Sequence, residues 1–335
     1  MPTTSLPQRP WVRGDVPIAW RDDRTLQVGD ATRTVVIPET DRSLVAWLLT
    51  MRGERTLAEA LTAAESEGLP RAAALRLVRQ VLPTGLVDDA AALPHSLRTA
   101  SPDLRDRLQG ELAAARVAHG SAQRAADILD RRLSATVAID GDGAVADALA
   151  AALAHAGVGS IERATRLSSS SRRSRRASAS RACHVLCNVA HPDAAAGPEA
   201  LALDIPHLPV AVFGSRAVIG PLVLPGLTGC LRCRDLHRAD QDSAWPRIAI
   251  QFQARRYVVP PMDSALVATA AGWAALQVLA WIESDRDPAG PLRWPAGWPG
   301  DAPPSVGGQV TMTVPGGAAQ RVDCPPHPLC GCRWR

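Results

Sequence analysis

The chain has 335 residues, of which 46% are hydrophobic, and its formal net charge at pH 7 is +4. This length exceeds what one compact domain usually needs, so we expect at least two domains with cores of their own. The charge is modest, and no single predicted element gathers the basic residues into a surface that could read nucleic acid. A nucleic-acid partner is therefore not expected.

The sequence gives no sign of export or of membrane insertion. Its first residues, MPTTSLPQRPWVRGD, lack the apolar core of a signal peptide. The most apolar stretch, 265–282, is alanine-rich and contains Gln277, which is typical of a buried helix rather than a membrane span. Seven cysteines without an export signal favour the reducing cytoplasm, where paired cysteines are more often metal ligands than disulfides. We expect a cytoplasmic protein with no membrane partner.

The N-terminal region combines short strands with helices. Extended segments separated by turn signals are predicted at 16–20, 25–29 and 33–39. Helical patterns follow at 40–51, 56–68 and 70–82, with Thr40 or Asp41 capping the first and Thr56 the second. An apolar segment at 84–89 ends the region. This order predicts a winged-helix-like α+β domain over residues 1–95, followed by a linker helix over 96–133.

The remainder, 134–335, has the pattern of an α/β domain. A strand at 136–139 leads through a glycine turn into an alanine-rich helix, then through Gly157 into a second strand. Further strands are predicted at 184–190 and 209–215, and an antiparallel pair at 309–315 and 319–324. The Ser/Arg run at 168–181 is typical of a solvated loop, with an anionic partner as the alternative.

The glycine turn fits the pattern G-x-G-x-x-G/A, with Gly141 and Gly143 between a strand and a helix. Such a turn lets a phosphate approach backbone N–H groups at a helix N-terminus. Asp142, however, places a negative charge where the phosphate would lie, and Glu162 is a possible partner for a ribose. Two interpretations remain open: a nucleotide site, or a turn kept for the fold alone.

Two cysteine pairs carry the strongest chemical signal. Cys230 and Cys233 form a CxxC pair, and Cys330 and Cys332 form a CxC pair near the C-terminus. Four thiolates are the usual ligand set of a closed, structural Zn²⁺ site, which leaves no position for a substrate. Thiol redox chemistry and unlinked cysteines are the alternatives. Spare ligands are Cys324 and His327, whereas His237 is expected to be a capping or surface residue.

Other candidate residues have simpler explanations. Cys183 and Cys187 flank a predicted buried strand and are expected to be small core residues rather than catalytic thiols. Asp193 follows that strand at the carboxyl edge of the sheet, where α/β folds place ligands. Trp273 and Trp281 share one helix face, which is typical of core or dimer packing.

The order of these features resembles the ThiF-like proteins, relatives of ubiquitin-activating enzymes. The resemblance covers about 134–335 and rests on AIDGDGAVADALAAALAHAGVGSIE, on PVAVFGSRAVIGPLVLPGLTGCLRC and on the C-terminal cysteine pair. It implies a Rossmann-like ThiF-type domain with a structural zinc site, and a homodimer. Adenylating members use an arginine, a lysine and a magnesium-binding aspartate, but this chain has no lysine, and the corresponding strand reads LCNVAHPD. ATP-dependent adenylation is therefore expected to be lost.

The N-terminal module, about 15–92, resembles the peptide-recognition domain of leader-peptide-binding proteins that partner YcaO-type cyclodehydratases in azoline formation. The resemblance implies that the third strand, Arg33–Ile37, and the third helix, Pro70–Leu82, hold a leader peptide by strand addition. By position alone, the candidate contacts are Val35, Ile37, Leu77 and Val81, and each could equally be a core residue.

Three functions follow from the sequence. The first is a non-catalytic protein that presents a ribosomally made precursor peptide to a YcaO-type enzyme. The second is an enzyme that adenylates a carboxylate with ATP. The third is a winged-helix DNA-binding regulator, disfavoured because the third helix carries Arg71, Arg76 and Arg79 but no Asn, Ser or Thr to read bases.

Overall fold

A computed structural model describes the chain over most of its length. The described residues are 6–14, 16–29, 34–92, 97, 101–119, 122–164, 182–187, 196–254, 261–285, 292–294 and 302–332. Contacts divide the chain into two compact units, Met1–Asp130 and Arg131–Arg335. The expected domain boundaries at 95/96 and 133/134 remain predictions. The Ser/Arg run and Asp193 lie outside the described residues.

The first unit contains a small antiparallel sheet with strand order β2-β3-β4. Its strands are β2 (Ile18–Trp20), β3 (Leu26–Val28) and β4 (Val35–Ile37). Three helices follow, α1 (Arg42–Leu48), α2 (Leu57–Ser66) and α3 (Arg71–Val81). Asp41 caps α1, and Thr56 forms a reciprocal capping box with Glu59 at the start of α2. The expected strands and helices are thus present in the expected order.

Two features of the first unit were not predicted. A short strand, β1 (Pro10–Val12), pairs antiparallel with β5 (Val87–Asp89), which joins the segment before the small sheet to the segment after the three helices. The single linker helix expected over 96–133 is instead two helices, α5 (Pro102–His119) and α6 (Ala122–Ser134). Short 3₁₀ turns occupy Leu82–Thr84 and Ala90–Ala92.

The second unit is built on a seven-stranded mixed sheet with order β12-β11-β10-β9-β8-β6-β7. The parallel half contains β6 (Thr136–Asp140), β7 (Ser160–Ala164), β8 (Cys183–Cys187) and β9 (His207–Phe213). The antiparallel half contains β10 (Arg216–Ile219), β11 (Gly308–Thr313) and β12 (Ala318–Asp323). The first βαβ turn, through α7 (Ala144–His155), and the final hairpin match the sequence predictions. The predicted α/β class is confirmed.

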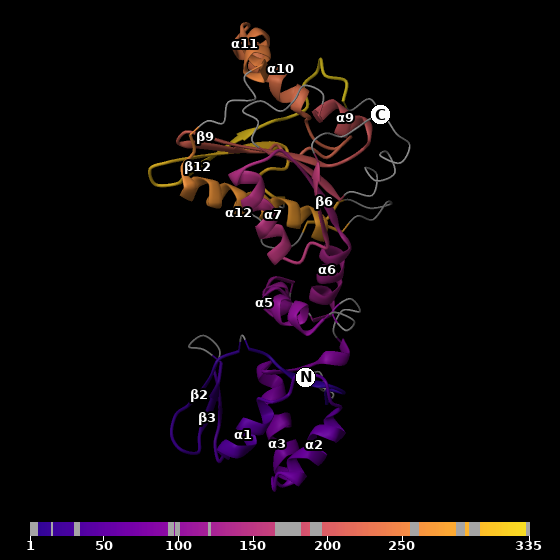
Figure 1. Cartoon of the computed structure of the whole chain (residues 1–335), viewed down its shortest axis with the longest axis vertical. Helices are drawn as coiled ribbons and strands as arrows, with labels where there is room; N and C mark the ends of the chain where they lie inside the picture. Colours follow the sequence, from indigo (N-terminus) through magenta and orange to yellow (C-terminus); the bar gives the residue numbers. More distant parts are fainter. Residues whose placement is uncertain are drawn as a thin grey trace. The chain divides into compact units, whose positions relative to one another are not determined.

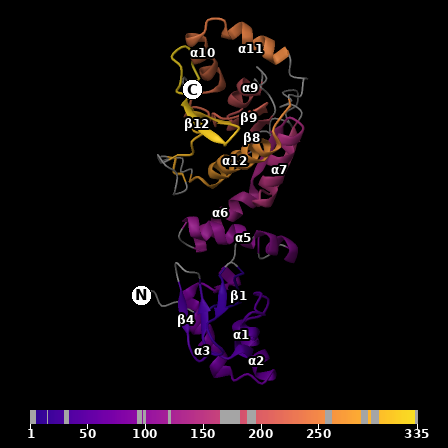
Figure 2. The same cartoon turned by 90° about the vertical axis from the view of Figure 1, so that its left-hand side faces the viewer.

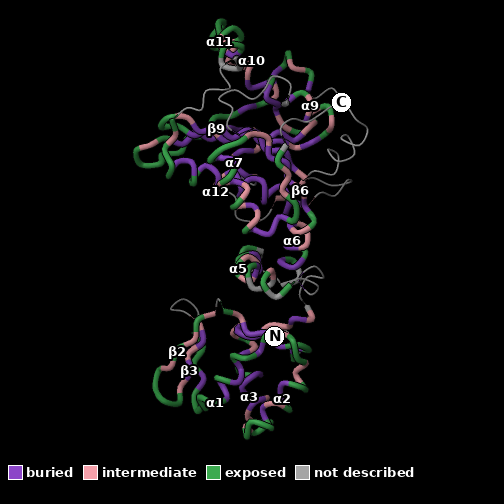
Figure 3. Tube along the Cα trace, in the orientation of Figure 1, coloured by how far each residue is buried: buried purple, intermediate pink, exposed green. Residues whose placement is uncertain are grey.

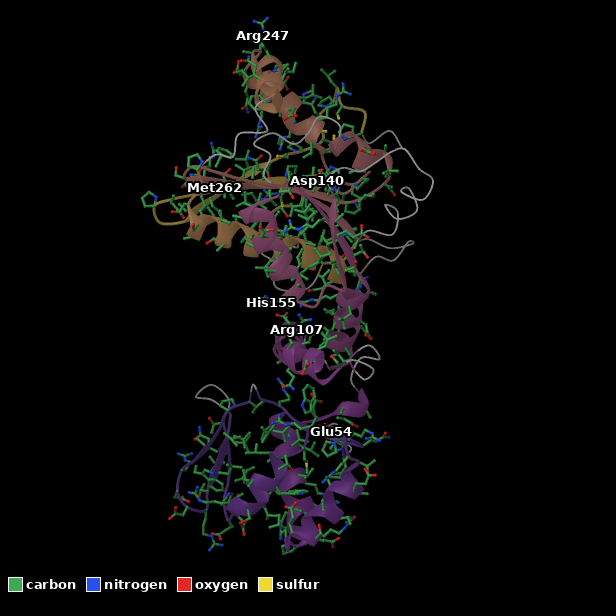
Figure 4. All side chains as sticks on the ribbon, in the orientation of Figure 1. Glu54, Arg107, Asp140, His155, Arg247 and Met262 are labelled. Carbon is green, nitrogen blue, oxygen red and sulfur yellow. The ribbon has the colours of Figure 1, made fainter. Side chains whose placement is uncertain are left out.

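Helices cover both faces of this sheet (Figures 1 and 2). Helices α7 and α12 (Ser264–Glu283) lie against one face, and α9 (Ala196–Ala202) and α10 (Leu231–Gln241) lie on the other, with α11 (Trp245–Ala254) beyond α10. Strand β8 shows the division: Val185 joins the core under α7 and α12, whereas its neighbour Leu186 packs against the cysteines of α10. Figure 3 shows the central strands of the sheet buried, whereas the edge strand β12 and helix α11 are largely exposed.

Helix α12 is the one described helix that is long and apolar enough to cross a membrane, and 67% of its most apolar window is buried within the protein. A core helix of a soluble protein meets the same criterion, so the finding is weak support for a membrane span. Trp281 on this helix is buried, and its indole N–H donates to the Ala182 carbonyl at 2.7 Å. Trp273 packs against the same core, in line with the packing role expected for both residues.

Candidate functional site

The four predicted metal ligands come together on the α10 face of the large sheet. Cys230 is the N-cap residue of α10 and Cys233 lies in its first turn, while Cys330 and Cys332 come from the segment after β12. All four Sγ atoms lie within 4.8 Å of one another. Cys230, Cys233 and Cys332 are buried and Cys330 is half-buried, so the cluster is largely closed to solvent.

The spacing of the sulfur atoms fits a tetrahedral metal ion. Cys230 Sγ lies 3.8 Å from Cys233 Sγ and 3.4 Å from Cys330 Sγ, and Cys233 Sγ lies 3.4 Å from Cys332 Sγ. A zinc–sulfur bond of about 2.3 Å in a tetrahedron separates the sulfurs by about 3.8 Å, whereas a disulfide joins them at about 2.05 Å. The cluster could therefore hold a metal ion through four free thiols.

The electrostatics of the cluster favour a thiolate at Cys233. The pKa of Cys233 is lowered to about 4, chiefly by the hydrogen bond from the Cys230 thiol and less by the His327 backbone, against the opposing effect of burial. The pKa of Cys230 moves in the opposite direction because its proton is shared with Cys233. Both residues lie at the N-terminus of a helix, whose dipole also favours negative charge.

A second group of possible metal ligands adjoins the first: His237, Asp240 and His327. Hydrogen bonds alone account for the closeness of these side chains, without a metal ion. The Leu329 N–H donates to His327 Nδ1 at 3.1 Å, so His327 must carry its proton on Nε2, which donates to Asp240 Oδ2 at 2.9 Å. Both ring nitrogens of His327 are thereby used, and the spare-ligand role considered for this residue is not supported by its geometry.

The glycine turn is shaped by packing against the neighbouring strand. Gly141 and Gly143 both have positive φ angles, of 116° and 85°. A Cβ atom on Gly141 would lie 2.5 Å from the carbonyl oxygen of Cys187 in β8, so only glycine fits there. The need for glycine at this position therefore arises within the fold, whether or not a nucleotide binds.

The charges around the turn oppose a phosphate. Asp142 is exposed beside the helix N-terminus, and Asp147 lies in the first turn of α7. The guanidinium of Arg163, at the end of β7, forms an ion pair with Asp147 and donates to the Gly141 carbonyl oxygen at 3.4 Å. Carboxylates thus already lie at the N-terminus of α7, where the helix dipole would otherwise favour a phosphate. Glu162 is half-buried in β7.

The candidate peptide contacts fall into two groups. Ile37, Leu77 and Val81 are buried in the hydrophobic core of the first unit, at 3%, 3% and 0% exposure. These three side chains therefore lie where core residues are expected, which was the alternative to peptide contact. Val35 is different: it shares a sheet face with Val28 and Ile18, yet 36% of it is exposed because β4 is the last described strand of the sheet.

The register of the small sheet identifies a residue that the sequence analysis did not single out. Gly29 N–H donates to the Pro17 carbonyl and Arg21 N–H to that of Thr25, which sets the alternation of hydrogen bonds between β2 and β3. The backbone groups of Leu26 and Val28 therefore point away from β2 and toward β4. Their partners Ile37 and Val35 point their own N–H and C=O groups back toward β3. The N–H and C=O of Val36 therefore point to the open edge of β4, and its side chain is 43% exposed.

The remaining cysteines show no feature of a reactive site. Cys183 and Cys187 lie at the two ends of β8, fully within the core beneath α7 and α12. Burial raises the pKa of each thiol to about 12, so neither is a thiolate at neutral pH. Their expected role as core residues agrees with this placement.

Comparisons with known proteins place the fold but not a family. No family model and no curated protein matches the chain. Among solved structures, the heterocyclase TruD matches with a TM-score of 0.54 at 18% identity, and a heterocyclase in complex with substrate and cofactor with 0.55 at 15%. Each match covers 97% of this chain, which spans only 42% and 39% of those two proteins. E. coli MccB with MccA matches over 97% of this chain and 99% of its own, with a TM-score of 0.50 at 14% identity. At these identities the likeness establishes a shared fold.

Proposed function

We propose that this chain is a non-catalytic peptide-binding protein that presents a ribosomally made precursor peptide to a YcaO-type cyclodehydratase. The fold it shares with heterocyclases, one of them bound to its substrate, and with MccB bound to MccA supports a role in modifying such peptides. The acidic surroundings of the glycine turn support a role without ATP chemistry. A homodimer in the cytoplasm remains our expectation.

The open edge of β4 carries the proposal. A peptide that adds a strand there needs an outward N–H and C=O for its backbone, which Val36 supplies, and an uncovered apolar surface for alternate side chains, which Val35 supplies. Among the described residues, no other strand occupies that edge. The core positions Ile37, Leu77 and Val81 would then support the edge from beneath rather than touch the peptide.

A proline substitution at the edge tests this function. Val36→Pro removes the outward N–H without breaking the bonds between β3 and β4, because proline is tolerated at an edge whose N–H faces solvent. Fluorescein-labelled leader peptides from precursor genes adjacent to this one, titrated into the full-length variant and followed by anisotropy, should bind about 5–10-fold more weakly.

Val36→Thr is the matched control, because it keeps the N–H and the β-branched shape and should bind within about two-fold of the wild type. Equal affinity of the proline variant and the wild type would exclude strand addition at β4. A wild-type protein that binds none of the leader peptides would exclude the peptide-binding function itself.

We also propose that the four-cysteine cluster binds one structural Zn²⁺ ion. The supporting observations are the sulfur spacing and the absence of a fifth ligand among the described residues within the cluster. The ion would tie the segment after β12 to the start of α10. Four protein ligands leave no position at which a substrate could be activated.

The alternative enzymatic function is favoured by one observation, the glycine turn at the start of α7. ATP–pyrophosphate exchange that is abolished by Gly143→Ala would establish it and would overturn the non-catalytic proposal.

The third function is DNA binding through α3, where Arg76 and Arg79 are exposed and could contact phosphates. A steep dependence of DNA affinity on salt concentration would be its signature.

A further inference from the structure

Helix α10 presents a stripe of three side chains to the C-terminal segment. Cys233, His237 and Asp240 are spaced by four and three residues, which places them on one face of the helix. The stripe contacts the segment at three points: Cys233 Sγ lies 3.4 Å from Cys332 Sγ, His237 Nε2 lies 3.0 Å from the Pro325 carbonyl oxygen, and Asp240 accepts from the His327 ring. Of these three side chains, only Cys233 belongs to the four-cysteine cluster.

His327 is the residue on which these contacts converge. Its backbone carbonyl accepts the Cys330 N–H at 3.0 Å. On its ring, Nδ1 accepts from the Leu329 N–H and Nε2–H donates to Asp240. The residue therefore contacts Cys330 through its backbone, and its ring joins the turn that carries Cys330 to helix α10.

The pairing with Asp240 is unusual in its exposure. The His327 side chain is 5% exposed, whereas that of Asp240 is 63% exposed. A surface carboxylate of this kind contributes little to the stability of a helix by itself. Its hydrogen bond nevertheless satisfies the one donor of a buried imidazole and so decides how that ring is oriented.

We propose that Asp240 and His327 are positioning residues of the four-cysteine site, which hold the C-terminal turn so that Cys330 and Cys332 meet Cys230 and Cys233 in ligating geometry. This inference rests on the proposed binding of a metal by the cysteines. It adds to that proposal an outer layer of contacts, contributed by α10, that sets how long the metal stays bound.

Loss of Asp240 should act on the metal through His327. Without the carboxylate, the buried Nε2–H of His327 loses its partner, and the ring reorients at the expense of the Leu329 contact. The turn that carries Cys330 then loosens, and the hydrogen bond from the Cys330 N–H to the His327 carbonyl weakens. Outer-shell partners of metal ligands typically contribute about 10–100-fold in metal affinity, so release should accelerate by about ten-fold or more.

The experiment measures zinc transfer from full-length protein to an excess of a chromophoric chelator at pH 8. Asp240→Ala should release zinc about ten-fold faster than the wild type. Asp240→Asn should fall between the two, because the amide oxygen still accepts the hydrogen bond. The control is Asp242→Asn, which removes a carboxylate charge near the end of the same helix but keeps an acceptor for the Ala244 N–H, and it should match the wild type.

Two further readouts separate positioning from a general structural role. The thermal stability that Asp240→Ala loses relative to Asp242→Asn should be smaller in the metal-free protein than in the zinc-loaded protein, and the cobalt-substituted forms should keep the charge-transfer band of four thiolates. Wild-type release rates in Asp240→Ala would overturn the inference, as would faster release matched by an equal loss of metal-free stability. If the wild-type protein binds no zinc at all, the proposal that the four cysteines form a metal site is wrong.

Discussion

Arg132 and Glu283 form an ion pair that is almost fully buried. Arg132 Nη2 lies 2.6 Å from Glu283 Oε1, and the two side chains are 10% and 8% exposed. Arg132 Nη1 also donates to the carbonyl oxygen of Ala156, the C-cap residue of α7, at 3.1 Å. One guanidinium at the end of α6 thus binds the C-terminal ends of both helices that cover one face of the large sheet.

Substitution of one partner should be costly because it leaves a buried charge unpaired. We expect Arg132→Met to lower the free energy of unfolding of the second unit by about 3–5 kcal/mol, whereas Arg132→Met combined with Glu283→Leu should recover much of the loss. Urea unfolding followed by circular dichroism measures both. Arg163→Met, which breaks the exposed pair with Asp147, is the control and should cost less than about 1 kcal/mol. Similar losses from Arg132→Met and Arg163→Met would contradict the buried-pair argument.

Gly141 should tolerate no side chain, for reasons of packing alone. A Cβ at this position would lie 2.5 Å from the Cys187 carbonyl oxygen, and the backbone has a φ of 116°. Gly141→Ala should therefore destabilise the second unit by at least about 2 kcal/mol in urea unfolding without any nucleotide. Gly214→Ala is the control: its φ is 55° and its Cβ would meet no atom within 4 Å, so the cost should be about 1 kcal/mol. Equal costs would mean that the contact with β8 is not the reason for the glycine.

Removal of the metal should destabilise the second unit and leave the first unit intact, because all four cysteines lie in the second unit. Cys233→Ser should abolish binding of one zinc per chain and cost several kcal/mol of stability, since metal-binding energy is coupled to folding. Elemental analysis and differential scanning calorimetry measure the two effects. Cys324→Ser removes a buried thiol outside the cluster and should keep the zinc. Retention of a full complement of zinc by Cys233→Ser would overturn the assignment of the ligands.

The features that the sequence predicted are those with a local signature. The strand, glycine turn and helix around Gly141 show a change of period within 20 residues, and the hairpin of β11 and β12 is marked by Pro315–Gly317 at its turn. The cysteine pairs are likewise recognisable from their spacing, although only the structure brings the two pairs together.

The features that the sequence missed depend on partners far away along the chain. Strand β1 has three residues, and it pairs with β5 more than 70 residues later, so no periodicity marks it. His327 and Asp240 are separated by 87 residues, and Arg132 and Glu283 by 151. The spacing of Cys233, His237 and Asp240 on one helix face was the available signal for the first pair, but a helix stripe does not identify what covers it. For Val36, the missing information was the register, which decides which residues of an edge strand face outward.

The stability of the second unit should fall as the pH drops below about 6.5 because of His207. This residue is fully buried at the start of β9, and its Nδ1–H donates to the Ile205 carbonyl at 3.0 Å, which leaves Nε2 unprotonated and without a hydrogen-bond partner. Burial lowers the pKa of His207 from 6.5 to about 4, against the smaller opposing effect of the Ile205 bond. Between these two values the unfolded chain binds a proton that the folded chain does not. Stability therefore rises with pH across this window, by about 3 kcal/mol in total.

His207→Phe isolates this contribution, because it keeps a ring of similar size in the core but cannot titrate. In urea unfolding between pH 4.5 and 7.5, the free energy of unfolding of the wild type minus that of the variant should decrease as the pH falls, since only the wild type has an imidazole that must stay neutral in the folded chain. Parallel curves over the whole range would show that His207 is protonated equally in the folded and unfolded chains, and would place the acid sensitivity of the second unit elsewhere.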